Sequence, residues 1–196
     1  MITFIIPTIG RNTLQKTIDS LLKQTNNNWK AIVVFDGVPK IKYEDSRIES
    51  IIIPKRGKLN HAGGVRNFAI KQVKTEWIGF VDDDDTLGPD YIEKFEEEIK
   101  LNSDTQCIIF RMTTVHDKSG IFPKPQDKNF IKNNVGISFV MKKKLNLLFE
   151  PSGTEDFTLL NKIREQGNKI VISPYVTYFV RELPKENKIH SRIIIN

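Results

Sequence analysis

Four consecutive aspartates, Asp82, Asp83, Asp84 and Asp85, are the residues of this sequence that most directly suggest chemistry. They follow the apolar run 77–81, which reads as a buried strand. Adjacent carboxylates repel one another, and at the end of a buried strand this is costly unless a cation neutralises them. Carboxylate oxygens beside phosphate oxygens suit Mg²⁺ or Mn²⁺. We therefore expect a divalent metal held against a phosphate-bearing ligand; a solvated acidic turn is the alternative.

Two other polar segments also follow apolar runs. Residues 7–11, from Pro7 to Arg11, come after run 2–6, and Asp36 ends run 29–35 before a glycine. The carboxyl ends of parallel strands share one edge of a sheet, where ligands bind in α/β proteins. The three segments should therefore meet. Asp36 could accept hydrogen bonds from a base or a ribose, or it could be a plain turn aspartate.

Two further places in the chain admit either a functional or a structural role. Arg66 lies in a helix that opens after two glycines, where it could meet a phosphate or a base edge. It could equally be a surface arginine. Glu155 and Asp156 begin a helix after residues 151–154, so they could stabilise its N-terminus as acids. Alternatively, one of them is a general base that takes a proton from a hydroxyl.

The elements that must position these residues alternate between strand and helix. Such alternation predicts an α/β fold with a mostly parallel central sheet and helices on both faces. We expect one domain over residues 1–196, because no linker or repeat divides the chain. The expected strands are 2–6, 29–35, 47–53, 77–81, 106–114, 135–141 and one or two within 169–180; the expected helices begin near residues 13, 65, 90 and 155.

Composition narrows the class of protein. The 196 residues are 28% charged and 39% hydrophobic, as in an ordinary globular domain, and the net charge is +6. The lysines are scattered without interleaved aromatics, so no nucleic-acid partner is expected, whereas peripheral membrane contact stays open. The single cysteine, Cys107, lies in an apolar run and reads as a buried strand residue. No run approaches the ~18 apolar residues of a membrane span, which predicts a cytoplasmic protein.

An ordered set of motifs resembles the family 2 glycosyltransferases of the GT-A fold, the nucleotide-diphospho-sugar transferase fold. The resemblance covers about residues 2–170. The matching stretches are FIIPTIGR (4–11), LLKQT (21–25), WKAIVVFDG (29–37), GVRN (64–67), WIGFVDDDD (77–85) and GTED (153–156).

The resemblance implies a role for each matching residue. Asp84 and Asp82 of the family's Asp-x-Asp motif would hold Mn²⁺ or Mg²⁺, and Asp156 would be the catalytic base. His190 only loosely matches a late family histidine near the diphosphate. The nucleotide-sugar site would comprise Pro7, Thr8, Arg11, Asp36, Arg66, Asp82 and Asp83.

The implied activity is a metal-dependent, inverting transfer of a sugar from a nucleoside-diphosphate sugar, with a UDP-sugar favoured, to an acceptor hydroxyl. Residues 1–101 would form the nucleotide-binding half and residues 102–196 the acceptor half. The acceptor, whether glycan, lipid or protein, is not indicated. The chain is short for this family and has no membrane segment, which favours transfer of a single sugar over polymerisation at a membrane.

Two other functions remain in competition. Asp82, Asp84 and Thr86 fit the Asp-x-Asp-x-Thr pattern of haloacid-dehalogenase-type phosphatases, in which Asp82 would be the nucleophile. That motif usually follows an early strand, however, and three strands are expected before this one. The other alternative is a non-catalytic module that binds a nucleotide sugar on the same fold.

Overall fold

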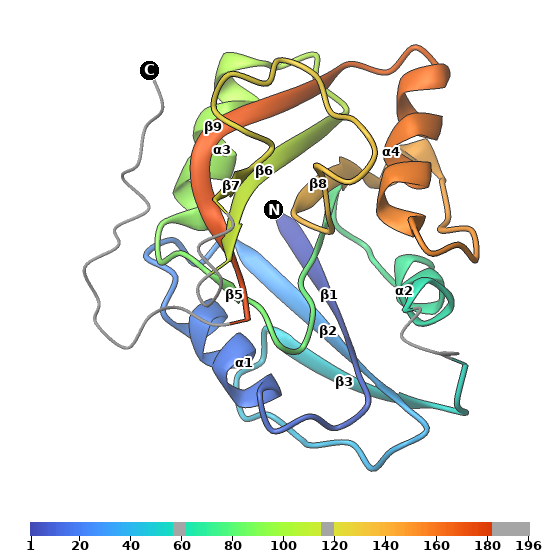
Figure 1. Ribbon diagram of the computed structural model, residues 1–196. Coiled ribbons are helices and arrows are strands. Elements are labelled where there is room, and N and C mark those ends of the chain that lie inside the picture. Colours follow the sequence, from blue (N-terminus) through green and yellow to red (C-terminus); the bar gives the residue numbers. More distant parts are fainter. Residues whose placement is uncertain (57–61, 115–119, 182–196) are drawn as a thin grey trace.

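The computed structural model describes residues 1–56, 62–114 and 120–181, and its strands and helices alternate through the first half of the chain (Figure 1). The strands are β1 (Ile2–Thr8), β2 (Trp29–Asp36), β3 (Ile48–Ile53), β4 (Trp77–Phe80), β5 (Thr86–Leu87), β6 (Cys107–Thr114), β7 (Ile121–Phe122), β8 (Phe139–Lys142) and β9 (Ile170–Val180). The helices are α1 (Leu14–Leu22), α2 (Gly63–Ile70), α3 (Tyr91–Leu101), α4 (Glu155–Glu165) and the short 3₁₀ helix η1 (Lys143–Leu145).

One sheet runs through the whole molecule, in the order β3-β2-β1-β4-β8-β6-β9-β5, with β7 beside β6. Strands β3, β2, β1 and β4 are all parallel. Beyond β4, strand β8 is antiparallel to both of its neighbours, while β9 is parallel to β6. Helices α1 and α3 lie on one side of the sheet and α2 and α4 on the other (Figure 1). The predicted α/β architecture with helices on both faces is confirmed.

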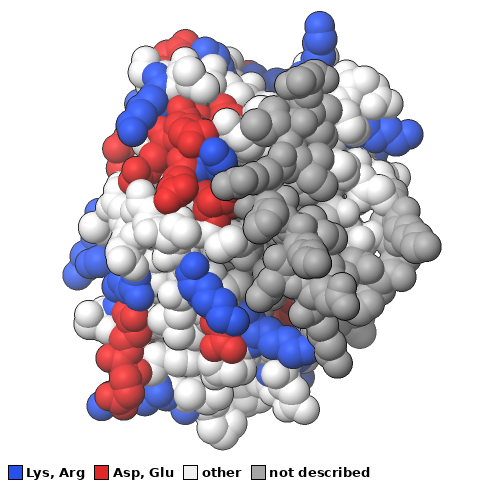
Figure 2. Space-filling view, turned by 90° about the vertical axis from the view of Figure 1, so that its left-hand side faces the viewer, with Lys and Arg blue, Asp and Glu red and all other residues white. Residues whose placement is uncertain are grey.

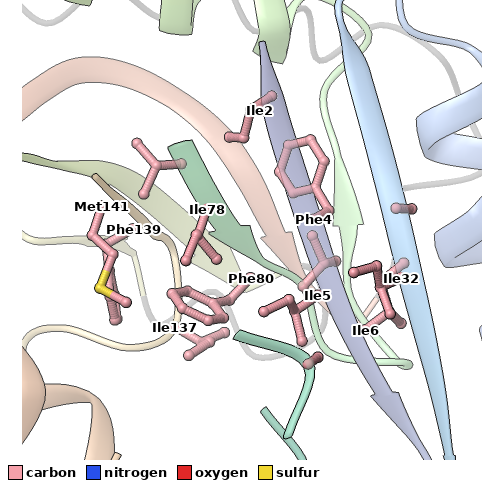
Figure 3. Close-up of a cluster of buried hydrophobic side chains, with 14 of the residues drawn as sticks. Ile2, Phe4, Ile5, Ile6, Ile32, Ile78, Phe80, Ile137, Phe139 and Met141 are labelled. Carbon is pink, nitrogen blue, oxygen red and sulfur yellow. The ribbon is translucent and has the colours of Figure 1, made fainter. Parts of the chain in front are cut away.

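The core is densest around β1, every residue of which is buried. Phe4 and Ile5 of β1 lie beside Ile78 and Phe80 of β4, as Figure 3 shows. Gly79 makes this packing possible, because a Cβ there would lie 2.7 Å from the Phe4 ring. Burial of this central strand fixes the place of the polar segments that follow β1 and β4.

The second half departs from the prediction in its details. Residues 121 and 122, which none of the expected strands included, pair with β6 as the strand β7. Strand β8 begins only at Phe139, four residues later than predicted; the preceding Ser138 accepts the Phe110 amide through its carbonyl and donates to the Phe110 carbonyl through its hydroxyl. Cys107 is buried in β6, as predicted.

Acidic side chains gather on part of one face of the molecule, with basic side chains beside them (Figure 2). Figure 2 shows the side on which α3 lies, with acidic and basic groups side by side. The glutamates of α3 are engaged locally: Glu93 accepts from Thr25, and Glu97 pairs with Lys94. Among the described residues, no helix combines the length and apolar character that crossing a bilayer would need.

Candidate functional site

The polar segments meet where the neighbouring parallel strands β1 and β4 end. In the order β3-β2-β1-β4, the chain first adds β2 and β3 on one side of β1 and then places β4 on the other side. The space between β1 and β4 is therefore a topological switch point, the position where open α/β sheets bind ligands. Thr8, the last residue of β1, donates a 2.7 Å hydrogen bond to Asp83 Oδ2. Arg11 donates to Asp83 at 3.2 Å and to Asp84 at 2.8 Å. The expected meeting of the loop after β1 with the aspartates is therefore observed.

Asp83 ties the two strand ends together. Burial raises its pKa, while the hydroxyl of Thr8 and the positive charge of Arg11 act in the opposite direction. The side chain of Asp83 is 7% exposed, whereas that of Asp84 is 34% exposed. Within the turn, Asp83 thus faces inward as a structural link and Asp84 faces the solvent side.

Asp85 is a buried member of the acidic turn that sequence reasoning did not single out. Its carboxylate accepts hydrogen bonds from the Tyr178 hydroxyl at 2.7 Å and from the Arg181 amide at 2.8 Å. Burial, with repulsion from Asp82 and Asp84, raises its pKa to about 7. Both partners lie at the end of β9, almost a hundred residues away, so no local pattern could have indicated them.

The turn fits a divalent cation. One carboxylate oxygen from each of Asp82, Asp84 and Asp85 lies within 4.8 Å of the other two. No hydrogen bond from another described residue reaches Oδ2 of Asp82 or Oδ1 of Asp84, since Arg66 and Arg11 bond the opposite oxygens. Three converging hard-oxygen ligands, one of them buried against like charge, match the preference of Mg²⁺ and Mn²⁺.

Pro7 and Asp36 are placed at the same edge of the sheet but are buried. Pro7 lies within β1, opposite Val34 of β2. Asp36 is 3% exposed, and its Oδ1 accepts the backbone amide of Arg56 at 2.5 Å. Asp36 therefore fixes the chain just after β3 to the end of β2, whatever else it contacts when a ligand binds.

An open pocket of about 460 Å³ adjoins the loop after β1. It is mostly apolar, with Arg11 as its charged side chain, and it lies between this loop and the segment after β2. The lining residues are Ile9, Gly10, Arg11, Asn12, Leu14, Gln15, Phe35, Val38, Pro39 and Ile41.

Arg66 is buried between two acids rather than lying on the surface. It is 4% exposed and donates 2.5 Å hydrogen bonds to Asp82 Oδ1 and to Glu155 Oε1. Burial acts to lower its pKa, but the charges of Asp82, Asp156 and Glu155 outweigh this and hold the pKa above its usual range. Arg66 thus connects the acidic turn with the beginning of α4.

Asp156 differs from the other acids of the site. Its Oδ1 is buried and has no hydrogen-bond partner among the described residues. Burial raises its pKa to about 7; Arg66 opposes the shift, while Asp82 and Glu155 add to it. A carboxyl group with a pKa near neutrality can accept a proton during a reaction. The helix N-terminus, which should favour the charged form, does not dominate here.

His190 lies outside the residues that the structure describes, as do residues 57–61.

Comparisons with known proteins agree on one family. The family model described as "Glycosyl transferase family 2" matches residues 3–183. WfaP of Escherichia coli, named UDP-Glc:alpha-D-GlcNAc-diphosphoundecaprenol beta-1,3-glucosyltransferase, is 28% identical over 179 residues, which are 81% of this chain and 68% of WfaP. An uncharacterized glycosyltransferase of Haemophilus influenzae is 27% identical over 110 residues, 55% of this chain but only 37% of that protein.

The fold has relatives among solved structures. TarS 1-349 of S. aureus, solved in complex with UDP-GlcNAc, superposes with a TM-score of 0.69 at 16% identity, covering 94% of this chain and 59% of TarS 1-349. At this identity the likeness shows the fold alone, and that fold is the expected GT-A α/β fold.

Proposed function

The chain belongs to glycosyl transferase family 2, and on that premise we propose that it transfers a sugar from a nucleoside-diphosphate sugar to an acceptor hydroxyl. The observation that carries the proposal is the junction of two unlike acidic groups across Arg66. One is a turn of bonded carboxylates, and the other is Asp156, whose buried Oδ1 has no partner among the described residues. A UDP-sugar is the favoured donor, because WfaP is named for UDP-Glc and TarS was solved with UDP-GlcNAc.

The sugar donor would bind at the ends of β1, β2 and β4. We assign Asp82, Asp84 and Asp85 to a Mn²⁺ or Mg²⁺ ion, which when bound would supply positive charge beside the diphosphate. The binding residues proposed for the nucleotide sugar are Pro7, Thr8, Arg11, Asp36, Arg66, Asp82 and Asp83. Arg11, with a side chain 40% exposed beside Asp84, is the basic group best placed to meet a phosphate.

In the proposed reaction, Asp156 accepts the proton of the acceptor hydroxyl. The hydroxyl oxygen forms a bond to the anomeric carbon while the bond from that carbon to the diphosphate oxygen breaks. The nucleoside diphosphate leaves with the bonding electrons, and the single displacement inverts the anomeric centre. A pKa near 7 suits this role, since the group is ionised in part at neutral pH yet basic enough to take a proton.

The two halves of the chain would bind the donor and the acceptor, respectively. Residues 1–101 contain the sheet edge assigned to the nucleotide, and residues 102–196 contain α4 with Asp156, on the acceptor side. Because the chain spans 37% of its Haemophilus relative, the acceptor and any further segments that such an activity needs are left open.

Family membership argues against the phosphatase alternative. A binding module without catalysis is the remaining competitor, and only turnover separates it from a transferase.

A thermal-shift panel of UDP, GDP, dTDP and CMP, each with Mn²⁺, Mg²⁺ or EDTA, tests the nucleotide-binding part of the proposed function. A ligand at about 100 times its Kd adds about 2.7 kcal/mol, which for a chain of this size is roughly 5–10 °C. We expect UDP to stabilise the protein only when metal is present. If no nucleoside diphosphate stabilises it with either metal, the nucleotide-sugar assignment is wrong, and phosphatase activity is tested next.

A further inference from the structure

Glu155, the first residue of α4, is a buried acid that binds a second helix. It is 8% exposed, and its two carboxylate oxygens have different partners. Oε1 accepts from Arg66 at 2.5 Å, and Oε2 accepts the backbone amide of Gly63 at 3.1 Å. Gly63 is the first residue of α2, whose N-terminal amides lack partners within the helix. One side chain therefore joins the first turns of α2 and α4.

The contact between α2 and the segment before α4 is too close for a larger residue at position 63. A Cβ on Gly63 would lie 2.5 Å from Glu155 Oε2 and 2.9 Å from the Phe149 side chain. Asn67, one turn further along α2, exchanges two hydrogen bonds with the backbone of Phe149, at 2.9 and 2.8 Å. Glu155 and Phe149 therefore both pack closely against the first turns of α2.

The link extends to the acidic turn through Arg66. Its second nitrogen bonds Asp82, so the path Asp82–Arg66–Glu155 runs from the end of β4 to the residue just before Asp156. The guanidinium also lies over the Phe149 ring, 5.3 Å from its centroid. Asp156 receives no comparable support, since its Oδ1 has no partner among the described residues. Its position therefore depends on its neighbour Glu155.

We propose that Glu155 is a positioning residue for sugar transfer, which through Arg66 and the Gly63 amide sets the place of Asp156 relative to Asp82. This inference rests on the proposed function. Displacement of a reacting group by about 1 Å can cost about 100-fold in rate without weakening substrate binding. Glu155 itself takes no proton in this scheme.

The variant Glu155→Gln tests the role with little change in volume. Its amide can accept from one partner but presents N–H groups to the other, so the link to Arg66 or to Gly63 is lost. The readouts are UDP release from UDP-glucose and UDP-N-acetylglucosamine with Mn²⁺, and UDP binding by calorimetry. We expect kcat to fall about 10- to 100-fold while the KM for the sugar donor and the Kd for UDP stay within about threefold of wild type.

A glycine pair in α2 supplies a second variant with a matched control. Gly63→Ala places a methyl group against Glu155, whereas the methyl group of Gly64→Ala meets no described residue within 4 Å. We expect Gly63→Ala to lower kcat with little change in donor KM and Gly64→Ala to behave as wild type.

The outcomes separate this inference from the proposed function. Wild-type kcat in Glu155→Gln, or a kcat that falls only as far as the protein's capacity to bind UDP falls, overturns the positioning role and leaves the transferase intact. A wild-type chain that neither binds UDP nor releases it from either sugar donor overturns the proposed function and this role with it.

Discussion

The acidic turn after β4 and the first turn of α4 both contain adjacent acids, but the protein surrounds them differently. Every carboxylate of the turn accepts at least one hydrogen bond, from Thr8, Arg11, Arg66, Tyr178 or the Arg181 amide. In α4, Glu155 is bonded twice, whereas Oδ1 of Asp156 is buried without a partner among the described residues. Hydrogen bonds favour the charged form of the carboxylates in the turn, which suits them to binding a cation. Asp156, whose Oδ1 lacks such a bond, is suited to accepting a proton.

Within the turn, the largest effect should come from removing the charge of Asp84, which faces the solvent side. Asp84→Asn keeps the shape but loses a metal ligand, so we expect UDP release to fall roughly 100-fold or more and the Mn²⁺-dependent shift with UDP to disappear. Asp104→Asn is the matched control, because among the described residues the Asp104 side chain pairs with Lys169 alone, at an exposed site. Undiminished metal-dependent stabilisation of Asp84→Asn by UDP would show that the turn does not bind the metal.

The assignment of Asp156 as the base also predicts that turnover depends on pH. Burial raises the pKa of Asp156 to about 7 in the metal-free protein, and a cation bound beside Asp82 would lower it. With Mn²⁺, turnover should therefore rise about tenfold per pH unit while Asp156 is protonated and level off by about pH 7. UDP release measured between pH 5 and 9 with Mn²⁺ checks this profile. A rate that stays constant from pH 5 to 7 would mean that Asp156 is not the base.

The raised pKa of Asp156 also predicts how the free energy of unfolding of the metal-free protein changes with pH. The native state binds the Asp156 proton more tightly than the unfolded chain, so the free energy of unfolding should fall as the pH rises from about 4 to about 7. Asp85 contributes in the same direction. In EDTA, Asp156→Asn should show a weaker fall over this window than wild type. Denaturant unfolding at several pH values measures it, and an unchanged slope would contradict the assigned shift.

A smaller effect on UDP binding is expected from removing the hydrogen bonds that Tyr178 of β9 makes to the acidic turn. Tyr178→Phe removes the hydroxyl that donates to Asp85 and accepts from the Asp82 amide, and should lower the free energy of unfolding by about 1–3 kcal/mol. It should also weaken UDP binding with Mn²⁺ a few-fold. Tyr175→Phe removes a hydroxyl that bonds Glu97 on α3, and should leave UDP binding unchanged. Equal UDP affinity in both variants would show that the support from Tyr178 does not matter for binding.

Sequence reasoning predicted the parallel half of the fold well, because its signals are local. Asp82 and Asp84 stood out since they follow a buried strand directly, and Thr8 and Asp36 end β1 and β2. Asp85 was predicted only as part of the acidic cluster, because its individual role depends on Tyr178, which reaches it only when β5 pairs with β9. The bond between Arg66 and Glu155 spans 89 residues, and neither residue's neighbours in the chain indicate it.

We propose that the acidic turn binds the metal and the nucleotide sugar, whereas Asp156 takes the proton of the acceptor. The variant Asp156→Asn tests this division most directly. On one preparation, calorimetry would give the Kd for UDP with Mn²⁺, and UDP release from UDP-glucose and UDP-N-acetylglucosamine would give turnover. The account predicts a Kd within about threefold of wild type and a turnover reduced about 10²- to 10⁴-fold, as for the loss of a general base. Turnover near the wild-type rate, or loss of UDP binding together with turnover, would contradict it.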